Sequence, residues 1–420
     1  MLLAMPDPDP TPVSPARPAG LVARNWGRGL GAVGVVAAVV AAVLAGSEAR
    51  AAASQVWPPF VLVTGLLLVG LVADQDGLFA AAGQRLAAAA PNGVVLFAGA
   101  AVLVATVTAL LNLDTSVVFL TPVLVYAARR RGRGETALLI GCLLMSNAGS
   151  LLLPGSNLTN LIVLGHLHLS GGQFLRHMAL PWLGAIVVTA GVIAVAERRS
   201  LAGGPGDRGA APEAPPRLAA LDEPDVAGAV SDSAPAPPVV GLGALAVVAV
   251  TVLVLVLANP ALPVAGVGLL VVVNRMVARR QQLGDVLEVV GVPVLVGLFG
   301  IATALGTLGR TWSGPAALLS HLDAVGTAVV AALSTVVVNN LPAAALLASR
   351  VPPHPFALLV GLDLGPNLFV TGSLAWILWW RTARTIGSAP PVRRAVTIGL
   401  VAVPLSMAAA LALLAGTGSP

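Results

Sequence analysis

Long apolar runs separated by short polar stretches dominate the chain. By residue number the runs cover 30–46, 57–73, 93–111, 115–127, 135–169, 178–196, 239–258, 261–274, 287–308, 323–338, 342–349, 355–381 and 395–415. A helix needs about 20 apolar residues to cross the hydrocarbon core of a bilayer. Because backbone groups in lipid must be hydrogen-bonded within the protein, the runs predict about ten helical membrane crossings.

Composition agrees with a membrane protein built from helices. Hydrophobic residues make up 57% of the chain and charged residues 10%, whereas soluble domains have about 25% charged residues. Aromatic residues, at 4%, are too few for the girdles of a membrane β-barrel, and no alternating strands of about ten residues occur. The predicted fold class is therefore an all-α polytopic membrane protein.

The basic residues are all arginine, since the sequence contains no lysine. This excludes a P-loop ATPase, whose phosphate-binding loop needs a lysine, and a Schiff-base enzyme. Cys142 is the one cysteine, which excludes an internal disulfide and a multi-cysteine metal site. The zinc-protease pattern His-Glu-x-x-His is also absent. We expect no metal and no cofactor.

Two polar segments divide the chain. Residues 1–28 are rich in proline and are expected to form a disordered cytoplasmic tail. Residues 198–238, rich in Pro, Gly and acidic residues, are expected to form a flexible cytoplasmic linker. The remaining segments, 29–197 and 239–420, are predicted to be two membrane halves.

Each half contains the same unusual pair of features. Two helical runs are separated by a short polar tip, at 112–116 in the first half and 339–342 in the second. An overlong apolar stretch with a Gly/Pro break follows, at 153–157 and 363–373. At 1.5 Å per residue these stretches overshoot a bilayer of about 30 Å. We expect a re-entrant hairpin and a discontinuous helix in each half.

Arginine clusters predict the orientation of the halves, because positive residues favour the cytoplasmic side. The clusters are Arg129, Arg130, Arg131 and Arg133; Arg198 and Arg199; Arg275, Arg279 and Arg280; and Arg381, Arg384, Arg393 and Arg394. With both hairpins re-entrant, they place the N-terminus in the cytoplasm and give the halves opposite orientations, although Arg310 and Arg350 then lie outside. Inverted-topology repeats with broken helices are typical of secondary transporters.

The tips and breaks are expected to hold the binding site, because an interrupted helix in lipid must find polar partners. Thr115 or Ser116, Asn157 and Ser373 are expected to be N-caps of the outgoing half-helices, and Pro342 to lie in a first turn. Four helix N-termini would then converge near the midplane, where they suit an oxygen-rich solute or an anion. The candidate substrate-binding residues are Asn112, Thr115, Ser116, Ser156, Asn157, Asn160, Asn339, Asn340, Asn367, Thr371 and Ser373.

Asp114 at the first tip and Asp363 just before the second break are the two acids that lie away from the ends of the predicted membrane segments. A carboxylate there costs at least about 2.5 kcal/mol on insertion scales, so it needs a proton, a cation or a hydrogen-bonded partner. Both residues are candidate proton or sodium carriers. The alternative is that each carboxylate caps or braces its break.

Four stretches carry a resemblance to a known family. They are Asn112-Leu113-Asp114-Thr115-Ser116 running to Leu120-Thr121-Pro122; Ser156-Asn157-Leu158-Thr159-Asn160; Val338-Asn339-Asn340-Leu341-Pro342; and Gly361-Leu362-Asp363-Leu364-Gly365-Pro366-Asn367 with Thr371-Gly372-Ser373-Leu374-Ala375. With them the chain resembles the arsenical pump membrane protein (arsenite permease) family, within the ion transporter superfamily that includes citrate-transporter-like proteins and divalent-anion/sodium symporters. The resemblance implies extrusion of arsenite or antimonite across the plasma membrane by the proton gradient.

The chain departs from that family's pattern at three positions. The Asn-Asp pair of the first tip is Leu113-Asp114 here, an Asp in the following helix matches Asn147, and a Lys after the second Gly-Pro matches Asn367. Asn147 is accordingly a third candidate position for ion coupling. A neutral, hydroxyl-bearing solute such as arsenite would fit polar tips that lack arginine, whereas a dicarboxylate would more often need a nearby cation.

Several alternatives stay open. On the same fold, the chain could carry a dicarboxylate, citrate or an inorganic oxyanion with sodium or protons. An intramembrane hydrolase using Ser156 or Ser373 with a histidine, and a structural membrane scaffold, are rivals of other classes; we expect no enzyme. The expected partners are the small solute or anion and a coupling proton or sodium ion, with a soluble ATPase subunit and a homodimer open and no nucleic acid.

Overall fold

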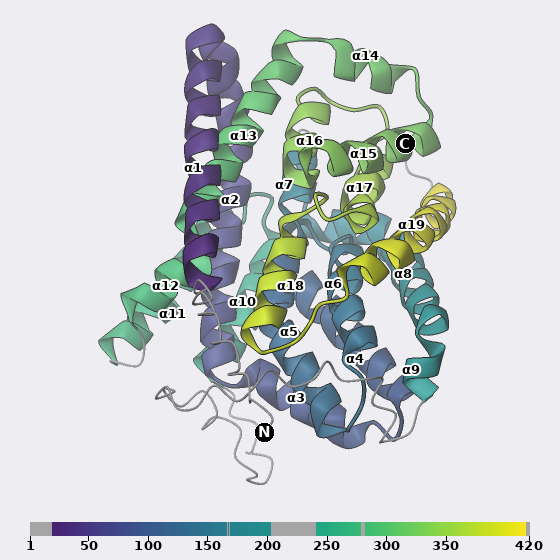
Figure 1. Cartoon of the computed structure of the whole chain (residues 1–420). Coiled ribbons are helices and arrows are strands. Elements are labelled where there is room, and N and C mark those ends of the chain that lie inside the picture. The colour runs from purple at the N-terminus through teal and green to yellow at the C-terminus, as the bar shows by residue number, and fades with distance from the viewer. Residues whose placement is uncertain (1–18, 166, 168, 203–240, 279–281, 417–420) are drawn as a thin grey trace, which may run out of the picture.

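The computed structural model describes residues 19–165, 167, 169–202, 241–278 and 282–416, which form helices and no strand (Figure 1). Among these residues, six helices are long and apolar enough to cross a membrane. They are α1 (Ala19–Leu44), α2 (Gly46–Gln75), α4 (Gly93–Leu110), α8 (Gly171–Ala196), α13 (Val292–Thr311) and α19 (Val392–Ala415). The predicted all-α polytopic fold is confirmed.

Shorter helices fill the space between the long ones. In the first half they are α3 (Leu78–Ala89), α5 (Leu113–Arg130), α6 (Thr136–Gly149), the 3-10 turn η1 (Pro154–Ser156), α7 (Leu158–Leu164) and α9 (Arg198–Ala202). In the second half they are α10 (Leu242–Val256), α11 (Ala261–Val277), α12 (Leu283–Val290), α14 (Gly314–Ser320), α15 (Ala324–Val338), α16 (Asn340–Leu347), α17 (Pro355–Leu364), the 3-10 turn η3 (Gly365–Leu368) and α18 (Leu374–Thr385).

All four expected interruptions of helical backbone are present. The first hairpin turns at Leu111 and Asn112 between α4 and α5, and the second at Asn339 between α15 and α16. The first broken helix is α6, η1 and α7, and the second is α17, η3 and α18. Gly and Pro residues within otherwise apolar runs account for both broken helices, since neither residue supports a continuous helix.

The two halves repeat one arrangement in inverted sense. Within the first half α4 packs on α6, and within the second α15 packs on α17. Across the halves α5 packs on α18 and α16 on α7, while α1 packs on α13 and α11 on α2. In Figure 1 the hairpin of α4 and α5 lies at the lower end of the molecule, and that of α15 and α16 lies at the upper end. Each broken helix therefore ends beside the hairpin of the other half.

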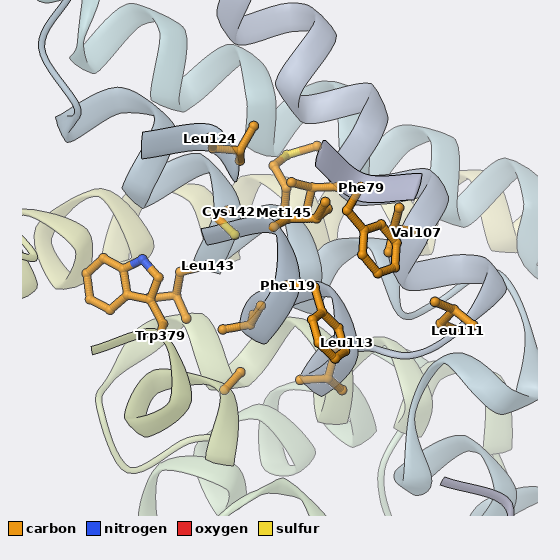
Figure 2. Close-up of a cluster of buried hydrophobic side chains, with 14 of the residues drawn as sticks. Phe79, Val107, Leu111, Leu113, Phe119, Leu124, Cys142, Leu143, Met145 and Trp379 are labelled. Atoms are coloured by element: carbon orange, nitrogen blue, oxygen red, sulfur yellow. The ribbon is translucent and has the colours of Figure 1, made fainter. Parts of the chain in front are cut away.

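An apolar core holds the first hairpin and both broken helices in place (Figure 2). Phe119 of α5 stacks on Phe79 of α3, with ring centroids 5.5 Å apart. Trp379 of α18 is fully buried against the first half, in the same cluster as Leu143 and Met145 of α6. Burial of such side chains stabilises by about 1.5–3 kcal/mol each, so the segments around the breaks are firmly positioned.

Some boundaries differ from the sequence-based expectations. Helix α1 begins at Ala19 rather than at residue 29, directly after Pro18, the last proline of the N-terminal segment, and no proline interrupts the helix beyond it. The rest of the expected tail lies outside the described residues. So does most of the expected linker, whose first residues form α9. The helices α3, α12 and α14 were not expected, because each is shorter than a membrane crossing.

Candidate substrate and ion site

The carboxyl group of Asp363 joins the two broken helices. Asp363 lies near the end of α17 and is fully buried. Its Oδ1 accepts a hydrogen bond of 2.8 Å from Nδ2 of Asn157 and another of 2.8 Å from Oγ1 of Thr159. Asn157 is the N-cap of α7, as expected, and Thr159 lies in its first turn. An acid of the second half is thus bound by the break of the first half.

A pair of amides joins the same two helices. Nδ2 of Asn147 in α6 donates to Oδ1 of Asn367 in η3 at 2.9 Å, and Asn367 donates in turn to the Leu144 carbonyl at 3.0 Å. Both asparagines are buried. They are also the two positions at which the arsenite permease pattern has an Asp and a Lys. The two positions noted as departures in the sequence are therefore in direct contact, as a pair of neutral amides.

Ser150 organises the loop of the first break. Its carbonyl accepts hydrogen bonds from Oγ of Ser156 at 2.6 Å and from Nδ2 of Asn160 at 2.8 Å. Its own hydroxyl donates to the Asn147 carbonyl at 2.7 Å. The hydroxyl of Ser156 and the amide nitrogen of Asn160 thus bond backbone oxygens of the loop. These bonds support a structural role for Ser156, while Oδ1 of Asn160 is left for another partner.

The second tip is tied to the second break. Asn339 has a φ of 75° and is the N-cap of α16, with Pro342 in the first turn as expected. Its Nδ2 donates to the Thr371 carbonyl at 3.2 Å, and the backbone N–H of Asn340 donates to the Gly372 carbonyl at 2.9 Å. The side chain of Thr371 is exposed and donates to the Val336 carbonyl.

At the first tip, the residue that caps the N-terminus of α5 differs from the one expected. Asn112, not Thr115 or Ser116, is the N-cap of α5: its Oδ1 accepts a hydrogen bond of 2.6 Å from the Thr115 N–H. The reason is that the extended backbone at Asn112 is followed directly by helix, and Asn caps as well as Ser. Asp114 lies in the first turn of α5, and Ser116 contacts the Val104 carbonyl at 3.5 Å.

Packing brings the first tip to the other segments. Helix α4 contacts η1 and packs along α6. At that contact Gly149 lies against Ala105 and Thr108, where a Cβ on the glycine would be 3.2 Å from Thr108 Cβ. The helix that leads to the first tip therefore packs against the first break. Hydrogen bonds join the first break to the second break and the second break to the second tip.

Several buried polar atoms of these segments have no hydrogen-bond partner within the described residues. They are Nδ2 of Asn112, Oδ1 of Asp114, Oγ1 of Thr115, Oδ1 of Asn147, Oδ1 of Asn160, Oδ2 of Asp363 and Oγ of Ser373. Ser373 is the N-cap of α18 by position, but its side chain makes no capping bond. Buried polar atoms in proteins are normally paired. These atoms are therefore candidate contacts for a solute or ion.

The site is acidic rather than basic. In the described part of the chain the ion pairs join Arg129 with Glu135, Arg275 with Asp76, and Arg394 with Glu197. Asp114 and Asp363 take part in none of these pairs. Of the seven unpaired atoms of these segments, four are carboxyl or amide oxygens, two are hydroxyl oxygens and one is an amide nitrogen.

Comparison with known proteins decides the family. The sequence matches the citrate transporter family (CitMHS) over residues 19–379, a range that includes both tips and both breaks. The chain belongs to the citrate transporter family. The structure is also similar to the YdaH transporter of Alcanivorax borkumensis, described as having an unusual topology, with 16% sequence identity and a TM-score of 0.49 over 88% of this chain and 87% of that one.

As a member of the citrate transporter family, the chain is a multi-pass membrane protein and a secondary transporter. The arsenite specificity implied by the sequence resemblance is a narrower claim than this membership. The described residues contain no group of three or more His, Cys, Asp or Glu side chains that could hold a metal ion.

Two residues of this transporter's site escaped the sequence-based selection. Thr159 lies within the Ser-Asn-Leu-Thr-Asn stretch, and its position two residues after the cap of α7 could have indicated a side chain directed at the break. Ser150 directly follows the last residue of α6. No signal in the sequence marks it, because its role depends on the fold of the loop.

Proposed function

We propose that this transporter exports arsenite and antimonite across the plasma membrane in exchange for protons. The observation that carries the proposal is the buried, unpaired oxygen of Asp363 in a site without a basic partner. Together with Oδ1 of Asp114, Asn147 and Asn160 it forms a set of acceptors. Arsenous acid is neutral near pH 7 and carries three hydroxyl groups, each a donor for such an oxygen.

An anion would meet the opposite conditions. A carboxylate or an oxyanion needs hydrogen-bond donors or a positive charge, because burying an unpaired charge is costly. The amide nitrogens of Asn147, Asn157 and Asn160 already donate to protein oxygens. The unpaired donors that remain are Nδ2 of Asn112 and the hydroxyls of Thr115 and Ser373, beside four unpaired oxygens that only accept. A set that mixes donors and acceptors and has no basic side chain supports a neutral polyhydroxyl solute, which can both donate and accept.

Asp363 and Asp114 carry the coupling proton in this proposal. A carboxyl group within the membrane that lacks a basic partner is a functional proton or cation site by default. Asn147 contributes indirectly, since it positions Asn367 next to the second break. The site-bearing half-helices rock to expose the site to one side and then the other, as in transporters with inverted repeats.

The test uses everted membrane vesicles with an imposed proton gradient. We expect arsenite accumulation in vesicles that contain the transporter, and its loss in Asp363→Asn and Asp114→Asn. Asp323→Asn is the matched control, because Asp323 is an exposed N-cap of α15 and Asn caps equally well. If both site variants keep full gradient-driven transport, the carboxyl groups of Asp363 and Asp114 do not carry the coupling proton.

Citrate is a second candidate substrate, favoured by the name of the family. The acceptor-rich site would then hold a sodium ion or another cation next to the citrate carboxylates. Sodium-dependent citrate uptake without arsenite transport in the same vesicles would establish this alternative. A positive result with either solute in liposomes of purified protein, without ATP, would also show that no ATPase subunit is needed.

We infer a cytoplasmic N-terminus, which the arginine clusters favour. Reporter fusions at the two termini test this arrangement: the N-terminal reporter should be active on the cytoplasmic side. Cross-linking of the purified transporter in liposomes tests for a homodimer.

A further inference from the structure

The side chain of Gln55 connects four helices away from the substrate site. Gln55 lies in α2, and its Nε2 donates to the Ile162 carbonyl of α7 at 3.0 Å and to the Ala348 carbonyl at the end of α16 at 2.9 Å. Its Oε1 accepts from Nη2 of Arg310 in α13 at 2.7 Å. The amide of Gln55 thus joins α2 and α7 of the first half to α13 and α16 of the second half.

The two carbonyls belong to the ends of site-bearing helices. Ile162 lies in the last turn of α7, and Ala348 is the C-cap of α16. Carbonyls at a helix C-terminus have no partner in their own helix. The other ends of these short helices are capped by Asn157 and Asn339, at the first break and the second tip. Gln55 therefore holds the far ends of the helices that begin at the site.

Neighbouring tryptophans place this contact near a membrane surface. Trp57 and Trp312 each lie two residues beyond Gln55 and Arg310, and they are 41% and 57% exposed. Tryptophan is enriched at the boundary between lipid and water. Water at that depth can take over the hydrogen bonds of a released carbonyl, so these bonds can break without leaving a buried polar group unpaired.

The end of α5, in the hairpin of the first half, makes a different contact from the end of α16 in the second. Arg129 of α5 bonds Glu135 at 2.5 Å, Ser388 at 3.0 Å and the Ile386 carbonyl at the end of α18 at 3.1 Å. These partners all flank the hairpin and the broken helices. The Gln55 contact differs because it also includes α2 and α13, which lie outside those elements.

We propose that Gln55 and Arg310 form a latch that opens in every transport cycle. If one half rocks on the other, the bond from Gln55 to Ala348 breaks because it joins the halves. If the hairpins and broken helices move together against α2 and α13, the same bond breaks. The inference rests on the chain being a transporter and not on which solute it carries.

Cysteine accessibility tests the latch. In a Cys142→Ala background, Ser349→Cys supplies a single reporter: Ser349 is 6% exposed, follows Ala348 and lies against Gly309 of α13. The protein is held in nanodiscs and labelled with a water-soluble maleimide. We expect Gln55→Ala to raise the labelling rate about tenfold, the factor that corresponds to about 1.4 kcal/mol.

Two further variants make the test specific. Gln55→Glu keeps an acceptor for Arg310 but loses the donor for both carbonyls, so it should label as fast as Gln55→Ala. Ser54→Ala, next to it, removes a hydroxyl that bonds the Ala51 carbonyl in the same helix, and it should label like the parent. A parental rate in either Gln55 variant, or a tenfold rise in Ser54→Ala, would overturn the proposal.

Cys142 provides the control for general loosening. Its thiol is 1% exposed in the core. In protein that retains Cys142 and Ser349, Gln55→Ala should leave the labelling of Cys142 at the parental rate. A parallel tenfold rise at Cys142 would mean that the variant loosens the whole fold, and the latch would be rejected.

Discussion

Nδ2 of Asn157 donates a hydrogen bond of 2.8 Å to Oδ1 of Asp363, across 206 positions of sequence and from one half of the transporter to the other. The same oxygen accepts a bond from Thr159. The contact joins the N-terminus of one half-helix to an acid of the opposite broken helix. It makes the charge of Asp363 and its hydrogen bonds separable by mutation.

Asp363→Asn should abolish coupling and preserve the fold. The Asn oxygen can still accept from Asn157 and Thr159, whereas the ionisable group is lost. We expect gradient-driven transport to fall by about tenfold or more, equivalent to about 1.4 kcal/mol, with a thermal midpoint close to that of the parent. Asp363→Ala should instead lower stability by about 1–3 kcal/mol for each donor left unpaired. Equal unfolding midpoints for the Asn and Ala variants would contradict this role of the hydrogen bonds.

Asn147→Asp and Asn367→Lys should each destabilise the protein and should compensate when combined. Either single change puts an uncompensated charge into a buried pair, at a cost of about 3–5 kcal/mol. In the double variant the two charges face each other, because the side chains are 2.9 Å apart. Unfolding in detergent, followed by size-exclusion chromatography, measures the three variants. Additive losses in the double variant would show that the positions do not interact.

Asn339→Ala should destabilise the second tip by about 1–2 kcal/mol. The Ala variant loses the side-chain cap of α16, and loss of such a cap costs about 0.5–2 kcal/mol. It also keeps the strain of a backbone at φ 75° and ψ 153°, a region that is essentially restricted to glycine. Asn339→Gly keeps the backbone conformation accessible, and it should lose only the side-chain bonds to Leu341 and Thr371. Thermal unfolding of the two variants should rank Gly above Ala, and the reverse order would refute the strain argument.

Gly70→Ala should displace the first tip, and Thr115→Ser should relieve the effect. A Cβ at Gly70 of α2 would lie 2.5 Å from Cγ2 of Thr115, and overpacking of this kind costs about 1–3 kcal/mol. Thr115→Ser removes that methyl group and keeps the hydroxyl. Gly191→Ala is the control, since a Cβ there meets no atom within 4 Å. Stability and transport of the double variant should exceed those of Gly70→Ala alone.

The interruptions in the helices could be predicted from sequence because each is a local conflict. Asn112, Asn339 and the Gly/Pro breaks stand within apolar runs, where only a turn or a non-helical segment explains them. The start of α1 and the short helices α3, α12 and α14 could not be predicted in this way, because a search for long apolar runs does not detect them.

The contacts of the site could not be predicted in the same way. Neither spacing nor composition relates Asn157 to Asp363, or Asn147 to Asn367, since each pair depends on how the halves pack. The N-cap of α5 was wrong for a related reason: Asn112, Thr115 and Ser116 are all suitable residues, and the backbone at the tip selects among them.

The division of the Asp363 contact between the halves has a consequence for complementation. A fragment with the first half alone would contain donors without their acid, and one with the second half alone the acid without its donors. If the chain is divided at a position between 203 and 240, each fragment expressed alone should not transport. The two fragments expressed together should restore transport, because each supplies the buried partners that the other lacks.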